Sequence, residues 1–131
     1  REEIELEVDR IIKEFNLTEF SKRNGYRLSG GERRKAEIAR AISIRPSFIL
    51  FDEPFTGIDP ITIVELKKML SYLKSKGLGI LITDHNVRDT LSITDRAYII
   101  SNGEILEEGI PDKIVADPRV KDVFLGEEFV L

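Results

Sequence analysis

The feature that most constrains the fold is the stretch FILFDEP at residues 48–54. Four apolar residues run directly into two adjacent acids, Asp52 and Glu53, and Pro54 follows them. Proline has no N–H to donate to a neighbouring strand, so strand pairing is expected to stop there. A short apolar run with such a boundary predicts a strand that is buried on both faces, as in a parallel sheet.

The two acids stand where such a strand would end. In open α/β sheets, ligands bind beyond the carboxyl ends of the strands. Two carboxylates at that place can hold a divalent metal ion and activate a water molecule. The alternative is that Asp52 and Glu53 simply begin a polar loop, and this stretch alone leaves both interpretations open.

Composition excludes several classes of protein. The chain has 131 residues, which suggests one domain, and its 41% apolar and 34% charged residues are typical of a soluble folded protein. The net charge of −4 argues against a broad nucleic-acid surface, so no nucleic-acid partner is expected. Without cysteine there is no disulfide or thiolate metal site. Neither a membrane span nor a signal peptide is evident, and the cytoplasm is the expected compartment.

Apolar periodicity and turn residues predict an alternation of helices and strands. In the first part of the chain we expect a helix over 2–15, a turn with a short helical piece over 16–27, a helix that begins after Ser29, the strand at 48–51, a helix from Pro60 that ends at Gly77 and Gly79, and a strand over 78–83. In the second part we expect a helix over 87–93, a strand over 97–101 that turns at Asn102–Gly103 and returns over 104–108, a helix over 111–116, a helical turn or two within 118–125, and a tail over 126–131. This order predicts an α/β fold in which helices flank a partly parallel sheet.

The segment LSGGE at residues 28–32 has two explanations. Ser29 and Glu32 have the spacing of a capping box, which would stabilise a helix start by about 1 kcal/mol. Gly30 and Gly31 are poor helix formers, and capping does not explain them. Consecutive glycines at a helix N-terminus let the backbone approach an anion such as a phosphate, where free N–H groups and the helix dipole favour negative charge.

Two further positions are candidates for function. His85 follows the second apolar strand, where strand topology should bring it near Glu53, although a lone histidine is more often a surface or capping residue. Asp59 precedes Pro60 and is sufficiently explained as the N-cap of a helix.

Taken together and in order, these motifs resemble those of the ABC-transporter ATPase family. The resemblance rests on LSGGE, FILFDEP, TGID and a strand that ends in TDH, and it covers the whole chain. It implies ATP and Mg²⁺ as cofactors, with Asp52 as the Walker B metal ligand and Glu53 as the catalytic base. It also implies that residues 28–32 grip the γ-phosphate of ATP held by a second subunit, that residues 56–59 form the D-loop, and that His85 senses the γ-phosphate. The implied cofactor-binding residues are Ser29, Gly30, Gly31, Glu32 and Asp59.

The family resemblance has an important gap. The chain contains no G-x-x-x-x-G-K-[ST] and no glutamine, so the P-loop and the Q-loop glutamine are absent. It begins at Arg1 within a helical pattern, and we expect it to be the C-terminal part of a P-loop ATPase of this family. Residues 1–45 would be the end of the helical subdomain and residues 46–131 part of the RecA-like core. On this interpretation some apolar sheet surface would be exposed, and the chain alone should neither bind Mg-ATP tightly nor hydrolyse it.

Within the family, the chain is most similar to ATPases of lipopolysaccharide export. That similarity rests on GGERRKAEIARA, DEPFTGIDP, GLGILITDHNVRDTL, AYIISNGEILEEG and FLGEEFVL. It implies a homodimer, transmembrane permease subunits as partners, and a peripheral position on the cytoplasmic face of the inner membrane. Two alternatives stay open: an ATPase of a branched-chain amino acid importer, and a non-catalytic chain that completes a site on another polypeptide.

Overall fold

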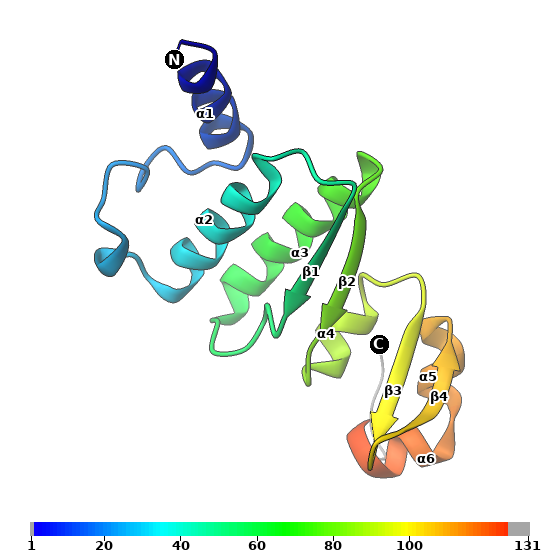
Figure 1. Cartoon of the computed structure of the whole chain (residues 1–131). Coiled ribbons are helices and arrows are strands. Elements are labelled where there is room, and N and C mark those ends of the chain that lie inside the picture. Colours follow the sequence, from blue (N-terminus) through cyan, green and yellow to red (C-terminus); the bar gives the residue numbers. More distant parts are fainter. Residues whose placement is uncertain (1, 126–131) are drawn as a thin grey trace. The chain divides into compact units, whose positions relative to one another are not determined.

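The structure, a computed structural model, describes residues 2–125 and separates the chain into two compact units (Figure 1). The first unit is Arg1–Thr83 and the second is Asp84–Leu131. This division falls after the second strand. The boundary at 45/46, which rests on the family resemblance, stays a prediction, and the tail at 126–131 lies outside the described residues.

The first unit combines helices with a parallel pair of strands. Its elements are α1 (Glu2–Glu14), the 3₁₀ turn η1 (Gly25–Arg27), α2 (Gly30–Ile42), β1 (Phe48–Asp52), α3 (Pro60–Ser75) and β2 (Gly79–Thr83). Phe48 of β1 pairs with Gly79 of β2, and Asp52 pairs with Thr83 at the carboxyl ends of the two strands. The predicted parallel arrangement of these two strands is confirmed.

Much of the core of this unit comes from one apolar stripe of α3. On α3, the apolar residues at spacings of three and four are buried: Leu66, Met69, Leu70 and Leu73. Ile49 and Phe51 of β1 are also buried. The strand therefore contributes one face to the core of the unit.

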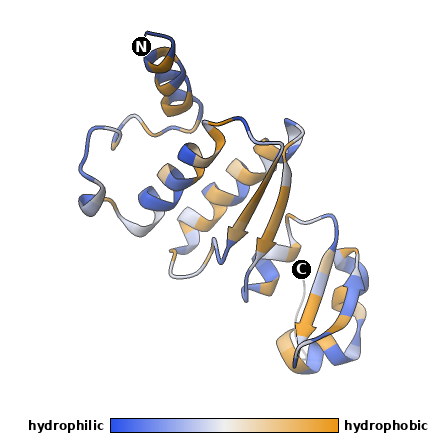
Figure 2. Cartoon of the chain, in the orientation of Figure 1, coloured by the Kyte–Doolittle hydropathy of each residue, from blue (hydrophilic) through white to orange (hydrophobic). Residues whose placement is uncertain are grey.

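The prediction that β1 is buried on both faces is wrong. Phe48 is 56% exposed and Leu50 69% exposed, and Leu81, the partner of Leu50 on β2, is 47% exposed. Figure 2 shows both strands as hydrophobic along most of their length. The apolar run reflects a strand with two apolar faces, but the described part of the first unit supplies no layer over the second face. We call Phe48, Leu50 and Leu81 the bare sheet face, and its exposure agrees with the expectation that apolar sheet surface would be uncovered.

Contacts from α3 hold the end of α1. The Tyr72 hydroxyl donates a hydrogen bond of 2.7 Å to Glu14 Oε1, and the rings of Phe15 and Tyr72 meet edge to face at 6.1 Å. The beginning of α1 carries exposed apolar residues, with Ile4 70% and Val8 48% exposed. The predicted amphipathic helix is confirmed, but only its last turn and the residues after it are buried.

The second unit is a hairpin covered by short helices. Its elements are α4 (Val87–Leu91), β3 (Ala97–Ser101), β4 (Glu104–Gly109), α5 (Pro111–Ala116), α6 (Pro118–Val120) and a short π-helical turn, η2 (Lys121–Leu125). Asn102 and Gly103 both have positive φ, +52° and +80°, which the predicted two-residue hairpin turn requires. The buried side chains of Leu91, Ile99, Ile114 and Val120 form a core within this unit.

The strands form two sheets rather than one. Strand β3 pairs with β4 in an antiparallel sheet, and neither pairs with β1 or β2. The mixed α/β class is confirmed, but the parallel and antiparallel parts are separate in the described chain. The Asn102–Gly103 turn brings β4 back against one edge of β3, which gives the antiparallel sheet. No helix in the described residues has the length and apolar character that crossing a bilayer requires.

Candidate functional site

The acids Asp52 and Glu53 stand at the carboxyl end of β1, as predicted. Asp52 is the last residue of β1 and is exposed, and its Oδ1 accepts a hydrogen bond of 2.6 Å from the Thr83 hydroxyl on β2. The backbone N–H of Glu53 donates a 2.7 Å hydrogen bond to the Thr83 carbonyl. Both acids are therefore anchored to the same residue of the neighbouring strand.

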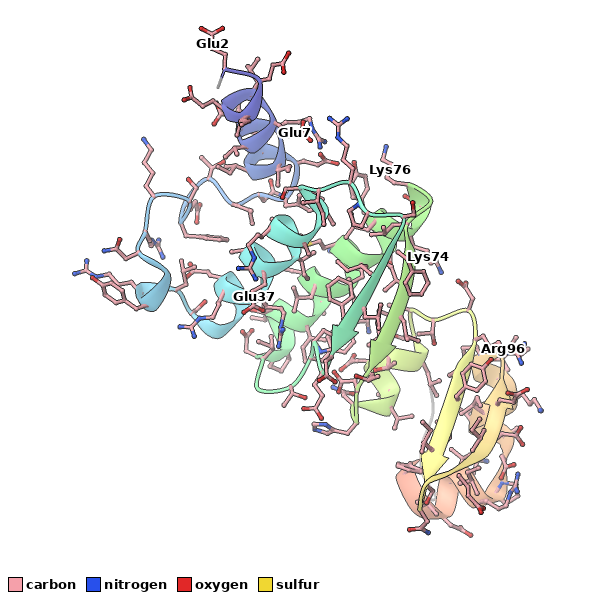
Figure 3. The ribbon with its side chains drawn as sticks, in the orientation of Figure 1. Glu2, Glu7, Glu37, Lys74, Lys76 and Arg96 are labelled. Carbon is pink, nitrogen blue, oxygen red and sulfur yellow. The ribbon has the colours of Figure 1, made fainter. Side chains whose placement is uncertain are left out.

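The backbone at Glu53 has an uncommon conformation. Its φ is +48°, in the left-handed region that residues other than glycine seldom adopt. The chain then enters the core, because Pro54 and Phe55 are buried. From α2, Arg34 Nη2 lies 3.5 Å from the Glu53 carbonyl oxygen, and its Nη1 pairs with Glu37, which Figure 3 labels on α2. Strained backbone conformations of this kind concentrate at functional sites.

The start of α2 is the capping box that the sequence predicts. Ser29 Oγ accepts a 3.2 Å hydrogen bond from the Glu32 N–H, and Glu32 Oε2 accepts a 2.9 Å hydrogen bond from the Ser29 N–H. The bond from the Ser29 backbone, together with the nearby guanidinium of Arg23 at 3.0 Å, holds the pKa of Glu32 below its ordinary value. Glu32 thus has a complete structural role as a cap.

The two glycines of α2 differ in their surroundings. A Cβ built on Gly31 would lie 2.3 Å from Thr62 Cγ2 of α3, whereas a Cβ on Gly30 would lie 3.6 Å from Ile58 Cδ1, an ordinary contact. Gly31 is buried and Gly30 is exposed. Close packing of α2 on α3 therefore explains Gly31. Of the two glycines, only Gly30 is left without a packing reason and so indicates an approaching ligand.

Asp59 is the N-cap of α3, as predicted. Its Oδ1 accepts from the Thr62 N–H at 2.9 Å and its Oδ2 accepts from the Thr62 hydroxyl at 2.5 Å. These hydrogen bonds, first of all the one from the side chain of Thr62, lower the pKa of Asp59. The same threonine thus fills the space beside Gly31 and satisfies Asp59.

His85 belongs to the second unit, where it is exposed and follows β2 after Asp84. Its carbonyl accepts a hydrogen bond from the Val87 N–H at 3.0 Å, and Asn86 caps α4 by accepting from the Asp89 N–H. These contacts set the backbone that carries the imidazole. That His85 lies near Glu53 stays a prediction.

A metal ion would have few protein ligands at this site. Among the described residues no group of three or more His, Cys, Asp or Glu side chains is arranged to hold a metal ion. Mg²⁺ is commonly bound by one or two carboxylates together with substrate phosphates and water. The exposed Asp52 carboxylate fits the role of a single ligand to Mg²⁺ that a nucleotide brings, and the described residues do not build an independent metal centre.

Three contacting residues were not singled out from the sequence: Arg34, Thr62 and Thr83. Thr62 stands three residues after Asp59, the spacing at which an N-cap receives its hydrogen bond, so this partner could have been found. Thr83 could have been paired with Asp52 by aligning the ends of the two apolar strands. Arg34 had no such signal, since its contact joins α2 to the turn after β1.

Comparison with known proteins identifies relatives of this chain. The family model described as ABC transporter matches residues 2–56. The lipopolysaccharide export system ATP-binding protein LptB of Haemophilus influenzae is 51% identical over 123 residues, which are 94% of this chain and 51% of LptB. LptB of Escherichia coli is 48% identical over 130 residues, which are 99% of this chain and 54% of LptB. The chain spans about half the length of these curated relatives.

Solved structures have the same fold. The crystal structure of the ADP conformation of an ATP-binding cassette of an ABC transporter matches with a TM-score of 0.86 and 30% identity, covering 97% of this chain and 52% of the cassette. The motifs, the relatives and the fold agree. Over nearly its whole length the chain is similar to ATP-binding proteins of ABC transporters, and it has the fold of their ATP-binding cassettes.

Proposed function

We propose that this chain is the part of an ABC transporter's ATP-binding subunit that carries the family signature, residues 28–32, and the Walker B strand with Asp52. We also propose that the transporter exports lipopolysaccharide. The observation that carries the proposal is the pair Asp52–Glu53 at the carboxyl end of β1, in a chain 48–51% identical to LptB proteins. In such a subunit, hydrolysis of ATP to ADP and phosphate drives transport.

The two acids have separate tasks in this proposal. Asp52 is the ligand of Mg²⁺, which when bound neutralises charge on the phosphates. Glu53 is the general base that removes a proton from the attacking water, a role that typically contributes about 10²–10⁴-fold in rate. The left-handed backbone at Glu53 supports this assignment, because strained conformations of this kind concentrate at functional sites.

The start of α2 is proposed to bind the γ-phosphate of ATP held by the opposite subunit. Its exposed Gly30 offers backbone N–H at the positive end of the helix dipole, where phosphate is favoured. In this arrangement the Ser29 hydroxyl and the Gly31 N–H contact the phosphate. Glu32 and Asp59 support the site through the caps that they form.

His85 is proposed to sense the γ-phosphate. It is joined to β2 through Asp84 alone, and β2 ends at Thr83, the residue that anchors both acids. This connectivity is the reason for including the imidazole in the site.

The proposed partners follow from the family. A second ATP-binding subunit completes each nucleotide site. The hydrolysis of ATP drives transport through transmembrane permease subunits. The subunit would lie on the cytoplasmic face of the inner membrane. Two relatives are named as parts of a lipopolysaccharide export system, whereas a third, 53% identical and from Azorhizobium caulinodans, is named only as a probable ABC transporter ATP-binding protein. The third name specifies no cargo, and a branched-chain amino acid importer, whose ATPase the sequence also resembles, is the alternative.

The 131-residue chain is expected to be inactive without another polypeptide, because it has no P-loop. The bare sheet face favours this interpretation, since it exposes Phe48, Leu50 and Leu81. A second polypeptide that carries a P-loop would both supply the missing phosphate contacts and cover that face. The chain and the second polypeptide would then form one ATPase site together. The chain would be inactive alone, as in the non-catalytic hypothesis, and would carry catalytic residues, as in the ATPase hypothesis.

Complementation tests the proposal. The chain is titrated with Mg-ATP alone, and then mixed with the part of H. influenzae LptB that it does not match. We expect no micromolar binding by the chain alone and release of phosphate by the mixture. Glu53→Gln should slow that release by roughly 10²–10⁴-fold, as expected for a general base.

Glu104→Gln is the matched control, because Glu104 is exposed at the hairpin of the second unit and has no proposed role. It should leave phosphate release unchanged. Turnover by the chain alone, or equal rates for Glu53→Gln and the unchanged chain, would contradict the proposal.

A further inference from the structure

Thr83 contacts both acids of the proposed site, through two different atoms. Its hydroxyl donates to Asp52 Oδ1 at 2.6 Å, and its carbonyl accepts from the Glu53 N–H at 2.7 Å. We propose that Thr83 is a positioning residue, whose hydroxyl orients the Asp52 carboxylate and whose carbonyl fixes the turn at Glu53. The inference rests on the proposed function for its catalytic meaning.

The hydroxyl contact defines the direction of the carboxylate. Asp52 and Thr83 are partners in the parallel register, at the last position of each strand. A hydrogen bond to Oδ1 restricts rotation of the side chain and leaves Oδ2 outside this bond, available to a metal ion. Since Asp52 is exposed at the end of a strand, packing does little to restrict it.

The carbonyl contact acts on the next residue. The Glu53 backbone has a φ of +48°, a conformation that persists only when neighbouring structure enforces it. The 2.7 Å bond from the Glu53 N–H to the Thr83 carbonyl extends the strand pairing by one step. One residue of β2 therefore sets the carboxylate of the metal ligand and the backbone of the base.

Stability alone does not explain the choice of threonine. Valine has the same branched shape and an equal or better tendency to form strands. A hydroxyl bond between exposed groups contributes little to folding compared with a buried one. The hydroxyl is thus better explained by the orientation that it gives Asp52.

The side-chain rotamer of Asp52 tests the proposal in the 131-residue chain itself. Three-bond couplings from the Asp52 Cγ to its backbone N and carbonyl carbon report the distribution of χ1 in NMR spectra. We expect one rotamer in the unchanged chain and in Thr83→Ser, which keeps the hydroxyl. We expect averaging over rotamers in Thr83→Val, which removes it without changing the shape. A single Asp52 rotamer in Thr83→Val would overturn the role of the hydroxyl.

The backbone contact is measured separately. The Glu53 amide should exchange slowly with solvent in the unchanged chain, and equally slowly in Thr83→Val, because the carbonyl is retained. Rapid exchange of this amide in the unchanged chain would overturn the role of the carbonyl.

Kinetics in the complemented enzyme connect orientation to catalysis. Loss of one ordinary hydrogen bond predicts that kcat falls about five- to tenfold in Thr83→Val, with little change in KM for ATP and recovery in Thr83→Ser. An unchanged kcat would overturn the catalytic part of the inference. If the unchanged mixture shows no turnover, the proposed function fails, while the couplings still decide whether Thr83 positions Asp52.

Discussion

Helices α2 and α3 begin in the same way but differ in what fills their first turns. Ser29 caps α2 and accepts from the N–H three residues on, and Asp59 caps α3 in the same manner. The first turn of α3 presents the Thr62 side chain, whereas the first turn of α2 presents Gly30 and Gly31. The α3 start is thus closed by its own side chains, whereas the α2 start leaves the backbone exposed at Gly30.

The comparison separates folding from function. Capping explains Ser29, Glu32 and Asp59, and the Thr62 side chain occupies the space beside Gly31. Only Gly30 has no such reason, since it is exposed and its Cβ would make an ordinary contact. Of the residues at the two helix starts, Gly30 is therefore the one whose identity points most directly to a ligand.

The largest expected effect on folding comes from Gly31→Ala. Its methyl group would meet Thr62 Cγ2 at 2.3 Å, and overpacking of this kind costs about 1–3 kcal/mol. We expect a loss of this size in the free energy of unfolding, read from the amide signals of α2 and α3 in urea. These signals report on the first unit without mixing in the unfolding of the second.

A second-site variant sharpens this test. Thr62→Ser removes Cγ2 but keeps the hydroxyl that donates to Asp59, so Gly31→Ala should be less damaging in the Thr62→Ser background. Strictly additive losses would show that the clash between these two residues is not the cause.

The next effect in size is the loss of the α3 cap. Asp59 accepts two hydrogen bonds from Thr62, and Ser29 accepts one from Glu32. Removing a cap costs about 0.5–2 kcal/mol, so Asp59→Ala should lie near the upper end and Ser29→Ala nearer the lower. Urea unfolding of each variant measures the difference, with Asp59→Asn as the control that keeps a good cap. If Asp59→Ala and Ser29→Ala lose equal amounts of unfolding free energy, the second hydrogen bond from Thr62 to Asp59 adds no stability.

How far could these features be predicted from sequence? Periodicity places the helices and strands to within a few residues. The apolar stripe of α3 and the apolar run of β1 are both local patterns of sequence. The caps are also local, since each joins residues three apart. The same local rules predict the Asn102–Gly103 hairpin, whose positive φ angles are observed.

Contacts between elements could not be predicted in this way. Nothing in the spacing of LSGGE shows that Thr62 fills the space beside Gly31, because that depends on the crossing of α2 and α3. The exposure of Phe48 and Leu50 likewise depends on which layers surround β1, and an apolar run cannot show that one layer is absent. The register that brings Thr83 to Asp52 could be predicted in part. It follows from the lengths of the two apolar runs once the strands are known to be parallel.

Acid should weaken both helix starts, by a smaller amount. The pKa values of Glu32 and Asp59 are lowered from 4.5 and 3.8 by the hydrogen bonds that they accept. A group with a lowered folded pKa contributes stability above its unfolded value and loses it as the pH falls through the folded value. The first unit should therefore become less stable as the pH falls below about 4.5.

The matched variant isolates the two caps. Glu32→Gln with Asp59→Asn removes both titrations and should flatten the fall in urea midpoint between pH 5 and pH 3. A residual slope is expected from Glu7, because its hydrogen bond with Arg10 lowers its pKa to about 2. An unchanged pH profile in the double variant would mean that the caps do not depend on charge.

The smallest expected effect on folding belongs to Gly30→Ala, and it is the sharpest test of the difference between the two helix starts. Alanine is a better helix former and its Cβ would lie 3.6 Å from Ile58 Cδ1, so the free energy of unfolding should stay the same or rise by up to about 1 kcal/mol. In the complemented enzyme the same methyl group would stand where the backbone is proposed to meet a phosphate, and phosphate release should fall. Gly25→Ala is the control, since a Cβ there has nothing within 4 Å and the residue lies outside the proposed site. Phosphate release at the unchanged rate in both variants would contradict a contact between Gly30 and the nucleotide. The start of α2 would then be explained by its cap and by its packing on α3 alone.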